Sequence, residues 1–362
     1  MKIVFLAYLH GYGGAERQII LLANAMSERG HDVTLISVCD GNICYALGRG
    51  IKYRHLPDRR KNALRLITRY IDIKKQLEEL RPDVSVSFWF QSAYLTAAMP
   101  KAVTGKVVYS ERGDPGDREY TGLMGLIRRL TLPRIDAFAF QSKAAQGYFD
   151  KSVRRRSAVI PNPVFVKAES FPEVCRRRKA IVTVGRLHPQ KNQRLLINAF
   201  ALIADRFPEY TLEIYGDGEL ENALKNQINS LSLRDRVFLM GTSDRVHELM
   251  RGAELFVLSS DYEGLPNTLM EAMALGMPCV STDCRPGGAR ELIDDGKNGV
   301  IVPVNDCRRL ADSIAELLSD SARRKAFGLA AAAKMKRFAP ERIYNKWDTF
   351  FRITAARRSE KC

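Results

Sequence analysis

The sequence lacks a long hydrophobic run, and no stretch within its 362 residues is apolar enough to cross a bilayer. Its first ten residues turn polar too soon for a secretory signal, so we expect residues 2–7 to form a buried strand. Cysteine is scarce and odd in number. The seven cysteines have spacings that suit neither zinc ligation nor a disulfide framework, which predicts a reducing, cytoplasmic setting.

Acidic residues are outnumbered, with 57 Lys and Arg against 41 Asp and Glu and a net charge of +16. Residues 1–165 hold 26 basic and 15 acidic side chains, a difference of +11, whereas residues 166–362 hold 31 and 26, a difference of +5. Such a surface favours nucleic acid, an anionic membrane or a phosphorylated ligand. The chain carries no nucleic-acid motif and no interleaving of aromatic with basic residues, so we expect no nucleic-acid partner.

The sequence does contain two series of alternating strand-like and helix-like segments, and its length suits two domains. Such series predict an α/β fold of two Rossmann-like, doubly wound parallel sheets. We predict an N-terminal domain over 1–165, a C-terminal domain over 166–340, and a helix within 341–362 that packs back on the first domain. The expected strands are 2–7, 32–38, 83–88, 106–110 and 137–140, then 180–184, 210–215, 237–240, 255–258, 278–282 and 299–302.

The segment 261–276 carries the clearest sign of a ligand site. Glu263 follows an apolar, β-branched strand, at the carboxyl end where ligands bind in open α/β sheets. A Gly-Leu-Pro turn comes next. Either Asn267 or Thr268 is then expected to N-cap a helix that carries Glu271 near its first turn.

The amides from Leu265 to Leu269 would form a helix N-terminus suited to an anion. Beside it, Glu263 and Glu271 offer hydrogen-bond acceptors alone. Together these groups suit a ligand with both phosphates and hydroxyls, such as a sugar nucleotide. Glu263 alone is equally well explained as a solvated loop residue, and Glu271 alone as a residue at a helix start, where the helix dipole favours a carboxylate. Their shared context is what favours the ligand site.

Several motifs in a fixed order resemble those of glycosyltransferase family 4, a group of retaining, metal-independent transferases with the GT-B fold. The resemblance covers essentially the whole chain, and the order and spacing of the motifs carry it. The motifs lie at 13–17 (Gly-Gly-Ala-Glu-Arg), 159–164 (Val-Ile-Pro-Asn-Pro-Val), 184–192 (Val-Gly-Arg-Leu-His-Pro-Gln-Lys-Asn), 214–218 (Ile-Tyr-Gly-Asp-Gly), 263–271 (Glu-x7-Glu), 287–293 (Gly-Gly-Ala-Arg-Glu-Leu-Ile) and 298–302 (Asn-Gly-Val-Ile-Val).

The resemblance implies a nucleotide-sugar donor, whose diphosphate gains negative charge as it leaves and must be neutralised. The chain has no Asp-x-Asp on a suitable loop and no His/Cys cluster, so we expect neither a metal nor a cofactor. By the resemblance, Arg186 and Lys191 hold the diphosphate. Glu263 contacts the transferred sugar, and Glu271 binds the ribose. The other donor-binding residues that it implies are Gly13, Gly14, Gly241, Thr242, Gly264, Leu265, Asn267 and Thr268.

One departure from the family concerns the reaction centre. Many members have a histidine after the fourth strand of the first domain, but this chain has none between His55 and His188. The segment 110–115 (Ser-Glu-Arg-Gly-Asp-Pro) stands there instead, and it resembles bacterial transferases that extend lipid-linked oligosaccharides. Arg112 is our candidate for the group near the acceptor or the leaving phosphate, with His10 and His188 as alternatives.

Two segments of the first domain, 59–75 and 120–134, mix basic and apolar residues at helical spacing. A core-facing apolar side with a solvated basic side is the commoner arrangement for any one such helix. Two of them in a domain of charge +11 favour an anionic membrane surface, with Arg128 and Arg129 among the residues that face it. We therefore expect a cytoplasmic protein, peripheral on the inner face of the cell membrane.

The function predicted from the sequence is transfer of a hexose or N-acetylhexosamine, with retention, from a nucleotide sugar to a lipid-linked saccharide in surface polysaccharide assembly. UDP is the expected nucleotide. Two alternatives stay open. One is a basic membrane- or nucleic-acid-binding protein on a degenerate GT-B fold, and the other is a GT-B epimerase or phosphorylase.

Overall fold

The computed structural model describes residues 1–9, 11, 13–39, 41, 43–58, 64–117, 120–166 and 177–357. The chain divides into two compact units. Unit 1 comprises Met1–Asn162 and Glu341–Cys362, and unit 2 comprises Pro163–Pro340. The chain thus leaves unit 1 shortly before residue 165 and returns to it with its last helix. Of the residues named above, His10 and 59–63 lie outside the described part of the chain.

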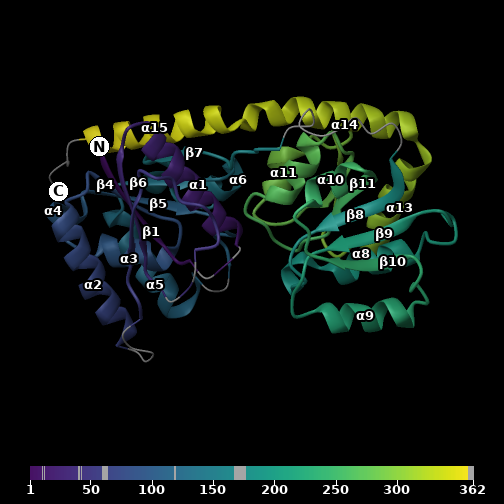
Figure 1. Cartoon of the computed structure of the whole chain (residues 1–362), viewed down its shortest axis with the longest axis horizontal. Coiled ribbons are helices and arrows are strands. Elements are labelled where there is room, and N and C mark those ends of the chain that lie inside the picture. Colours follow the sequence, from purple (N-terminus) through teal and green to yellow (C-terminus); the bar gives the residue numbers. More distant parts are fainter. Residues whose placement is uncertain are drawn as a thin grey trace. The chain divides into compact units, whose positions relative to one another are not determined.

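Unit 1, most of which Figure 1 draws in its first colours from purple to blue, is built on a parallel sheet. The strand order is β3-β2-β1-β4-β5-β6-β7. Its central strands are buried on both faces, as expected of a doubly wound sheet. The strands are β1 (Lys2–Ala7), β2 (Asp32–Ser37), β3 (Lys52–His55), β4 (Val84–Ser87), β5 (Lys106–Glu111), β6 (Ala137–Phe140) and β7 (Ser157–Val159).

Helices cover both faces of this sheet. The first and last helices, α1 (Gly14–Glu28) and α15 (Pro340–Ala356), pack on one face, where Trp347 and Phe351 of α15 are fully buried. The ring of Phe351 lies 6.2 Å from that of Phe5. The other face is covered by α2 (Arg65–Leu80), α3 (Phe90–Ala97), α5 (Gly122–Thr131), α6 (Lys143–Gly147) and α7 (Lys151–Arg155).

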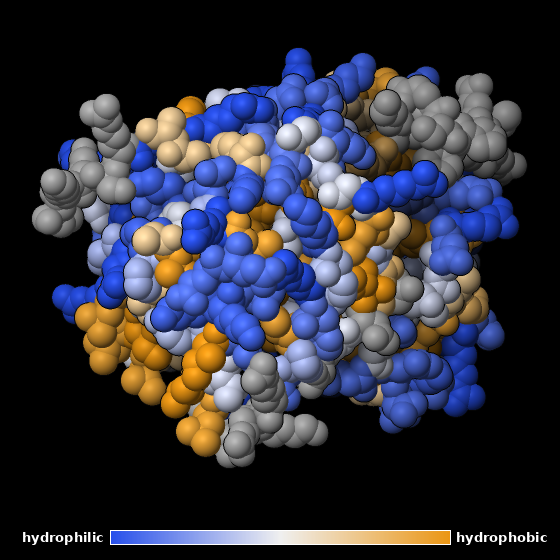
Figure 2. Space-filling model, turned by 60° about the vertical axis from the view of Figure 1, so that its left-hand side comes forward, coloured by the Kyte–Doolittle hydropathy of each residue, from blue (hydrophilic) through white to orange (hydrophobic). Residues whose placement is uncertain are grey.

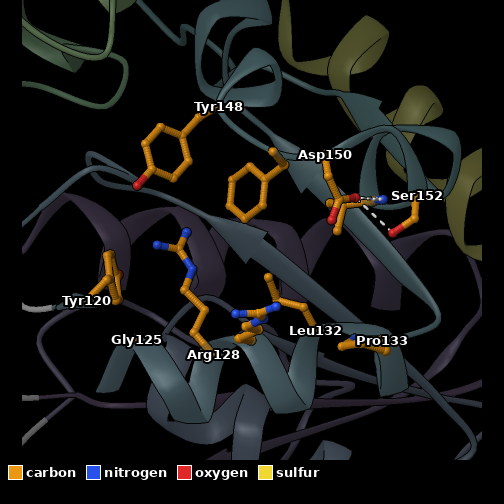
Figure 3. Close-up of a pocket in the computed structure, with 11 residues that line it drawn as sticks. Tyr120, Gly125, Arg128, Leu132, Pro133, Tyr148, Asp150 and Ser152 are labelled. Atoms are coloured by element: carbon orange, nitrogen blue, oxygen red, sulfur yellow. Dashed lines mark hydrogen bonds between the residues drawn. The ribbon is translucent and has the colours of Figure 1, made fainter. Parts of the chain in front are cut away.

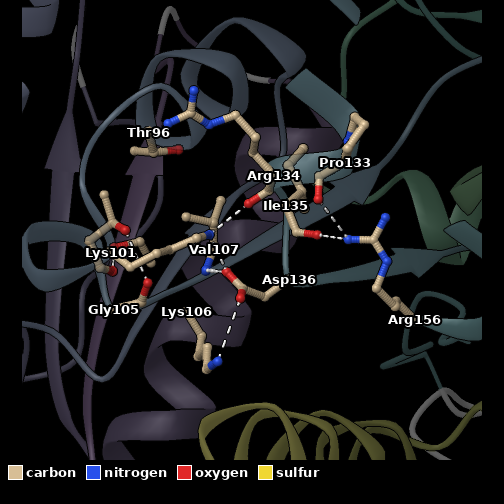
Figure 4. Close-up of polar contacts among 12 residues, drawn as sticks. Thr96, Lys101, Gly105, Lys106, Val107, Pro133, Arg134, Ile135, Asp136 and Arg156 are labelled. Carbon is tan, nitrogen blue, oxygen red and sulfur yellow. Dashed lines mark hydrogen bonds and ion pairs between the residues drawn. The ribbon is translucent and has the colours of Figure 1, made fainter. Parts of the chain in front are cut away.

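A polar cluster fixes the amino ends of β5 and β6 (Figure 4). Asp136, which precedes β6, accepts hydrogen bonds from the Nζ of Lys101 and, at 2.8 Å, from the backbone N–H of Val107. The Arg156 guanidinium donates to the carbonyls of Pro133 and Ile135. Burial lowers the pKa of Lys101, and Asp136 opposes that shift. These contacts hold the amino ends of the strands. The loops at the opposite, carboxyl ends carry the candidate site residues of the sequence analysis.

Unit 2 is also a parallel sheet, in the order β10-β9-β8-β11-β12-β13. The strands are β8 (Arg178–Val184), β9 (Thr211–Tyr215), β10 (Val237–Gly241), β11 (Ala253–Leu258), β12 (Cys279–Thr282) and β13 (Val300–Val302). One face is covered by α8 (Gln193–Ala201), α9 (Glu221–Ser230) and α13 (Cys307–Ser319). The other is covered by α10 (Val246–Arg251), α11 (Asn267–Ala274), α12 (Gly288–Leu292) and α14 (Ser321–Met335).

The predicted α/β class and the two Rossmann-like sheets are confirmed. The start of α11 was predicted wrongly. Pro266 occupies the N-cap position without a side-chain hydrogen bond, and Asn267 is already the first helical residue. The extended backbone of Pro266 (φ −70°, ψ 107°) leads straight into the helix, so neither Asn267 nor Thr268 caps it. Both side chains are half-buried in the first turn.

Candidate functional site

The strand order of unit 2 marks where a ligand site is expected. From β8 the chain adds β9 and β10 on one side of the sheet, then crosses over to build β11, β12 and β13 on the other. The strands β8 and β11 are therefore neighbours at the point where the order reverses. Ligands of open α/β sheets bind at the carboxyl ends of the strands at such a point. The loops 185–192 and 259–266 follow these two strands.

Lys191 and Glu263 meet at this point. The Nζ of Lys191, at the end of η4 (Pro189–Lys191), hydrogen-bonds to Oε1 of Glu263 as part of an ion pair. The hydroxyl of Ser260 donates to the same oxygen at 2.8 Å. The two charged side chains are only 18% and 10% exposed. A buried carboxylate needs compensation, and these two donors supply it while fixing the direction of the carboxylate.

Further hydrogen bonds join the two loops into one structure. The backbone N–H of Asp261 donates to the carbonyl of Gln190 at 2.9 Å, and the amide of Gln190 donates to the carbonyl of Tyr262 at 2.8 Å. The hydroxyl of Ser259 donates to the carbonyl of Lys191 at 2.9 Å. The position of the lysine relative to the glutamate is thus set by backbone contacts as well as by their charges.

Glu271 lies in the second turn of α11 and pairs with His247 of α10. The Nε2 of His247 is 3.1 Å from Oε2 of Glu271, and both side chains are largely buried. The sequence analysis did not identify His247. Its signal was weak, because a single histidine on a short helix has no motif around it, and its contact with the glutamate appears only once α10 and α11 pack together.

Two glycine contacts bring backbone segments of the site close together. A Cβ on Gly288 would lie 1.9 Å from the carbonyl oxygen of Gly264, in the loop that holds Glu263. A Cβ on Gly216, whose φ is +133°, would lie 2.1 Å from the carbonyl oxygen of Gly185. Only glycine fits at either place, so both glycines keep these loops in close contact.

The other predicted donor residues of unit 2 differ in exposure. Arg186 is exposed, and its side chain forms no ion pair with any residue that the structure describes. Gly241 has a φ of +67°, and its carbonyl accepts from the backbone N–H of Gly216 at 2.8 Å. Thr242, next to it, is exposed. Leu265 is buried in the core, so only its backbone is left for a ligand.

In unit 1, the glycine pair begins α1. Gly13 is the N-cap residue of α1 and makes no side-chain cap hydrogen bond, and Gly14 is the first helical residue. A Cβ on Gly13 would lie 1.5 Å from Oε2 of Glu16, so the carboxylate of Glu16 occupies the space that any other side chain would need. Backbone and carboxylate thus lie together at the carboxyl end of β1.

Arg112 follows β5 and is half-buried, whereas Arg186 is exposed. Its Nη1 donates to Oδ1 of Asn162 at 2.7 Å, and its guanidinium lies 4.0 Å from the centre of the Phe88 ring. Burial lowers the pKa of Arg112 to about 9, and the neighbouring Glu111 opposes that shift. The Nε is buried and has no hydrogen-bond partner among the described residues.

Arg128 was expected at the surface, and that expectation is wrong. Its side chain is buried, with Nη1 donating to the carbonyl of Pro115 at 2.7 Å and Nη2 lying 3.5 Å from Oε2 of Glu111. Burial raises the pKa of the Glu111 carboxyl, while Arg128, Tyr109 and two backbone amides oppose the rise. An arginine can be drawn inward here because a buried carboxylate needs its charge.

Aromatic rings complete the surroundings of Arg128 (Figure 3). The guanidinium lies 4.3 Å from the centre of the Tyr120 ring and 4.8 Å from that of Phe149. A pocket of about 320 Å³ opens beside it, between α5 and the segment 148–153. Arg129 also lines this pocket and is exposed. Of the two arginines that were predicted to form a basic surface on α5, only Arg129 is therefore exposed.

Comparison with known protein families defines the class. The family described as Glycosyltransferase Family 4 matches residues 12–167, and the one described as Glycosyl transferases group 1 matches residues 168–334. The chain therefore belongs to the group 1 and family 4 glycosyltransferases of the GT-B fold, and the predicted resemblance is confirmed.

Among curated proteins, the chain is 27% identical over 354 residues to a Campylobacter jejuni enzyme, covering 96% of this chain and 97% of that one. That enzyme is named GalNAc-alpha-(1->4)-GalNAc-alpha-(1->3)-diNAcBac-PP-undecaprenol alpha-1,4-N-acetyl-D-galactosaminyltransferase. An exopolysaccharide phosphotransferase of Streptomyces coelicolor is 32% identical over 296 residues, which are 80% of this chain but 30% of that protein. These relatives associate the chain with glycosyl transfer in polysaccharide assembly.

Among solved structures, HepE of Anabaena in complex with UDP superposes with a TM-score of 0.83 at 22% identity, covering 98% of this chain and 100% of that chain. The lipopolysaccharide outer core galactosyltransferase WaaB superposes with a TM-score of 0.76 at 20% identity, covering 98% and 99%. Both likenesses concern the fold. Within the described residues, no helix has the length and apolar character that crossing a membrane requires.

Proposed function

We propose that this chain is a retaining transferase that moves a hexose or an N-acetylhexosamine from a UDP-sugar to a saccharide on a lipid carrier. The observation that carries the proposal is the arrangement at the reversal point of the unit 2 sheet, where Lys191, Glu263 and Glu271 are held in place by neighbouring side chains. A cation, two carboxylates and a helix N-terminus suit a ligand with a diphosphate and many hydroxyls.

In this proposal unit 2 binds the donor. Glu271, oriented by His247, accepts hydrogen bonds from the ribose hydroxyls. Arg186 and Lys191 hold the diphosphate together with the first amides of α11. Glu263 accepts from hydroxyls of the transferred sugar. Backbone groups complete the proposed donor site of unit 2 at Gly241, Thr242, Gly264, Leu265, Asn267 and Thr268.

The proposed reaction breaks the bond between C1 of the sugar and the diphosphate oxygen, and it forms the bond from C1 to the acceptor oxygen on the same face. The proton of the acceptor hydroxyl passes to the departing diphosphate. Arg186 and Lys191 offset the charge that grows there, which is why we propose a metal-independent reaction. A covalent intermediate would need a free carboxylate nucleophile, and Glu263 is engaged with Lys191 and Ser260.

Unit 1 is the proposed acceptor domain. Arg112 keeps its proposed place near the acceptor or the leaving phosphate, and its position directly after β5, at the carboxyl end of the strand, supports that assignment. A lipid-linked acceptor is favoured because the Campylobacter jejuni relative, whose name specifies an undecaprenol diphosphate acceptor, matches over nearly the full length of both chains. We therefore propose that the enzyme works in the cytoplasm, peripheral on the inner face of the membrane.

A screen of nucleotides and nucleotide sugars tests this proposal. We expect UDP to raise the Tm of the purified protein more than GDP or ADP, and at least one UDP-hexose or UDP-N-acetylhexosamine to be slowly hydrolysed to UDP. Conversion to an epimeric UDP-sugar without release of UDP would instead identify an epimerase. Sugar release that depends on inorganic phosphate would identify a phosphorylase. If the protein binds no nucleotide, the proposed donor site is wrong.

A further inference from the structure

Two helices of unit 1 have an arginine that faces inward. In α2, both Nε and Nη2 of Arg69 donate to the carboxylate of Asp58 at 2.7 Å, and the guanidinium lies 5.1 Å from the centre of the Tyr8 ring. In α5, Nη1 of Arg128 donates to the carbonyl of Pro115 at 2.7 Å, its Nη2 lies 3.5 Å from Oε2 of Glu111, and its guanidinium lies 4.3 Å from the centre of the Tyr120 ring. Both arginines belong to segments whose basic residues were expected at the surface, and both are instead part of the interior.

The side chains that these helices expose are aliphatic. Leu123, Leu126 and Leu130 of α5 are 54–72% exposed and lie three and four residues apart, so they form one stripe along the helix. In α2, Ile67 and Ile71 are 57% and 56% exposed and lie four residues apart. Apolar side chains of both helices thus reach solvent as well as the core, whereas an ordinary surface helix turns its apolar side to the core.

The two stripes belong to one layer of the unit. Both helices cover the same face of the unit 1 sheet, and α3 lies in that layer with them (Figure 1). On the face of the molecule that Figure 2 shows, apolar side chains reach the surface at the lower left, and a second group lies to the right of the centre. We define the α2–α5 surface as Leu66, Ile67, Ile71, Leu123, Leu126 and Leu130.

Basic side chains accompany the α2–α5 surface. Arg65 begins α2, and Arg129 lies between Leu126 and Leu130 along α5; both are exposed and form no ion pair among the described residues. Aliphatic side chains next to unpaired cations are complementary to a bilayer with anionic headgroups. A protein partner is less well matched, because hot spots of protein interfaces are enriched in Trp and Tyr, and leucine is under-represented in them.

We propose that the α2–α5 surface inserts its aliphatic side chains into the outer part of an anionic bilayer, with both helices lying in the membrane plane. The inference rests on the proposed function, because a lipid-linked acceptor must be reached at a bilayer. Apolar contact is then the main source of membrane binding, and the exposed arginines add to that binding. Membrane binding is therefore only partly sensitive to salt.

Vesicle co-sedimentation with matched variants tests the proposal. The protein is mixed with vesicles of phosphatidylglycerol and phosphatidylethanolamine, or of phosphatidylcholine alone, at 0.1 M and at 1 M salt. The test variant is Leu126→Ser/Leu130→Ser. The control is Leu202→Ser/Leu329→Ser, which changes two leucines of unit 2 that are 60% and 66% exposed. Serine leaves the net charge unchanged, and the Tm and the Kd for UDP of each variant report on folding and on the donor site.

We expect the test variant to bind the anionic vesicles about ten-fold more weakly or worse, because two leucines lose their apolar contact, and the control to bind like the parent. Arg129→Gln should have a smaller effect that disappears at 1 M salt, where the Debye length is about 3 Å. Equal binding of test and control variants would overturn the inference. So would a parent dimer, seen by sedimentation velocity, that the test variant converts to monomer.

The result separates this inference from the proposed function. If the parent does not bind vesicles but binds UDP normally, the membrane surface is wrong and the donor site stands. If the parent binds vesicles but no nucleotide, the proposed function is wrong instead. Membrane binding by the α2–α5 surface is then not explained by a lipid-linked acceptor.

Discussion

Lys191 and Glu263 lie 72 residues apart in the chain, and the lysine Nζ hydrogen-bonds to the glutamate Oε1. The contact joins the loops that follow β8 and β11, the two strands at which the sheet order reverses. A cation proposed to hold the diphosphate and a carboxylate proposed to hold the sugar are therefore in direct contact. Glu271 is held in a similar way, by its contact with His247.

Replacing Glu263 should affect turnover more than donor binding. Glu263→Ala removes the proposed acceptor for hydroxyls of the sugar whose bond changes, and a charge-assisted hydrogen bond contributes about 1.5–3 kcal/mol, or roughly ten- to hundred-fold. We expect kcat for UDP release to fall by that factor while the Kd for UDP changes little. Steady-state kinetics and titration calorimetry measure the two quantities. A large loss of UDP affinity with unchanged kcat would assign Glu263 to the nucleotide instead.

Glu271→Ala should weaken UDP binding by roughly ten- to hundred-fold through loss of the ribose hydrogen bonds. His247→Ala should have a smaller effect in the same direction, since it removes the group that orients the carboxylate. Titration calorimetry with UDP measures both. Glu248→Ala is the matched control, because Glu248 is an exposed acid of α10 that pairs with Arg245. An unchanged affinity in Glu271→Ala would remove the ribose assignment.

Activity should survive chelation of divalent cations. If Arg186 and Lys191 neutralise the leaving diphosphate, an excess of EDTA leaves the rate of UDP release nearly unchanged, whereas Arg186→Ala or Lys191→Ala loses most of it. Arg194→Ala serves as a control, because Arg194 is an exposed arginine of the neighbouring helix α8. Loss of activity in EDTA that magnesium or manganese restores would contradict the proposed role of the two cations.

The buried pair of Glu111 and Arg128 should control stability. Removing one partner of a buried ion pair costs about 3–5 kcal/mol, so Arg128→Met should lower the free energy of unfolding by that amount at pH 8. The pKa of Glu111 is already raised by burial and rises further in the variant. A raised native pKa means that stability is greatest below the unfolded value and falls as the pH rises through the native one.

Urea unfolding at pH 5 and pH 8 measures this effect. The deficit of Arg128→Met relative to the parent should be smaller at pH 5, where Glu111 can be protonated. The double variant Glu111→Gln/Arg128→Met should be more stable than the single variant at pH 8, because no uncompensated charge remains buried. A deficit that is the same at both pH values would show that lost packing, and not charge, is the cause.

The sequence predicted the two sheets because their strands are apolar and β-branched and alternate with amphipathic segments. This pattern is local, since it depends only on residues that are neighbours in the chain. The positions of Glu263 and Glu271 on a loop and a helix after a strand followed from the same pattern. The inward turn of Arg69 and Arg128 could not be predicted in this way. Each arginine is drawn inward by a carboxylate and aromatic rings from other segments, and such contacts exist only after folding.

Two features of the candidate site were missed for a similar reason. The contact between His247 and Glu271 depends on how α10 packs against α11, which the local sequence does not specify. The start of α11 was misplaced because Asn267 and Thr268 are common capping residues, whereas the extended backbone of Pro266 begins the helix one position earlier. Close packing of Gly288 on the loop of Gly264 was equally invisible in the sequence.

The most direct test of the account is to follow the anomeric proton of the transferred sugar by NMR while the purified enzyme acts on an α-linked UDP-sugar and a diphosphate-linked lipid saccharide. We predict that UDP is released as an α-linked product forms, and that Lys191→Ala and Glu263→Ala lose this product together. A β-linked product would contradict the retaining mechanism. Product formation at the parent rate in both variants would contradict the site itself.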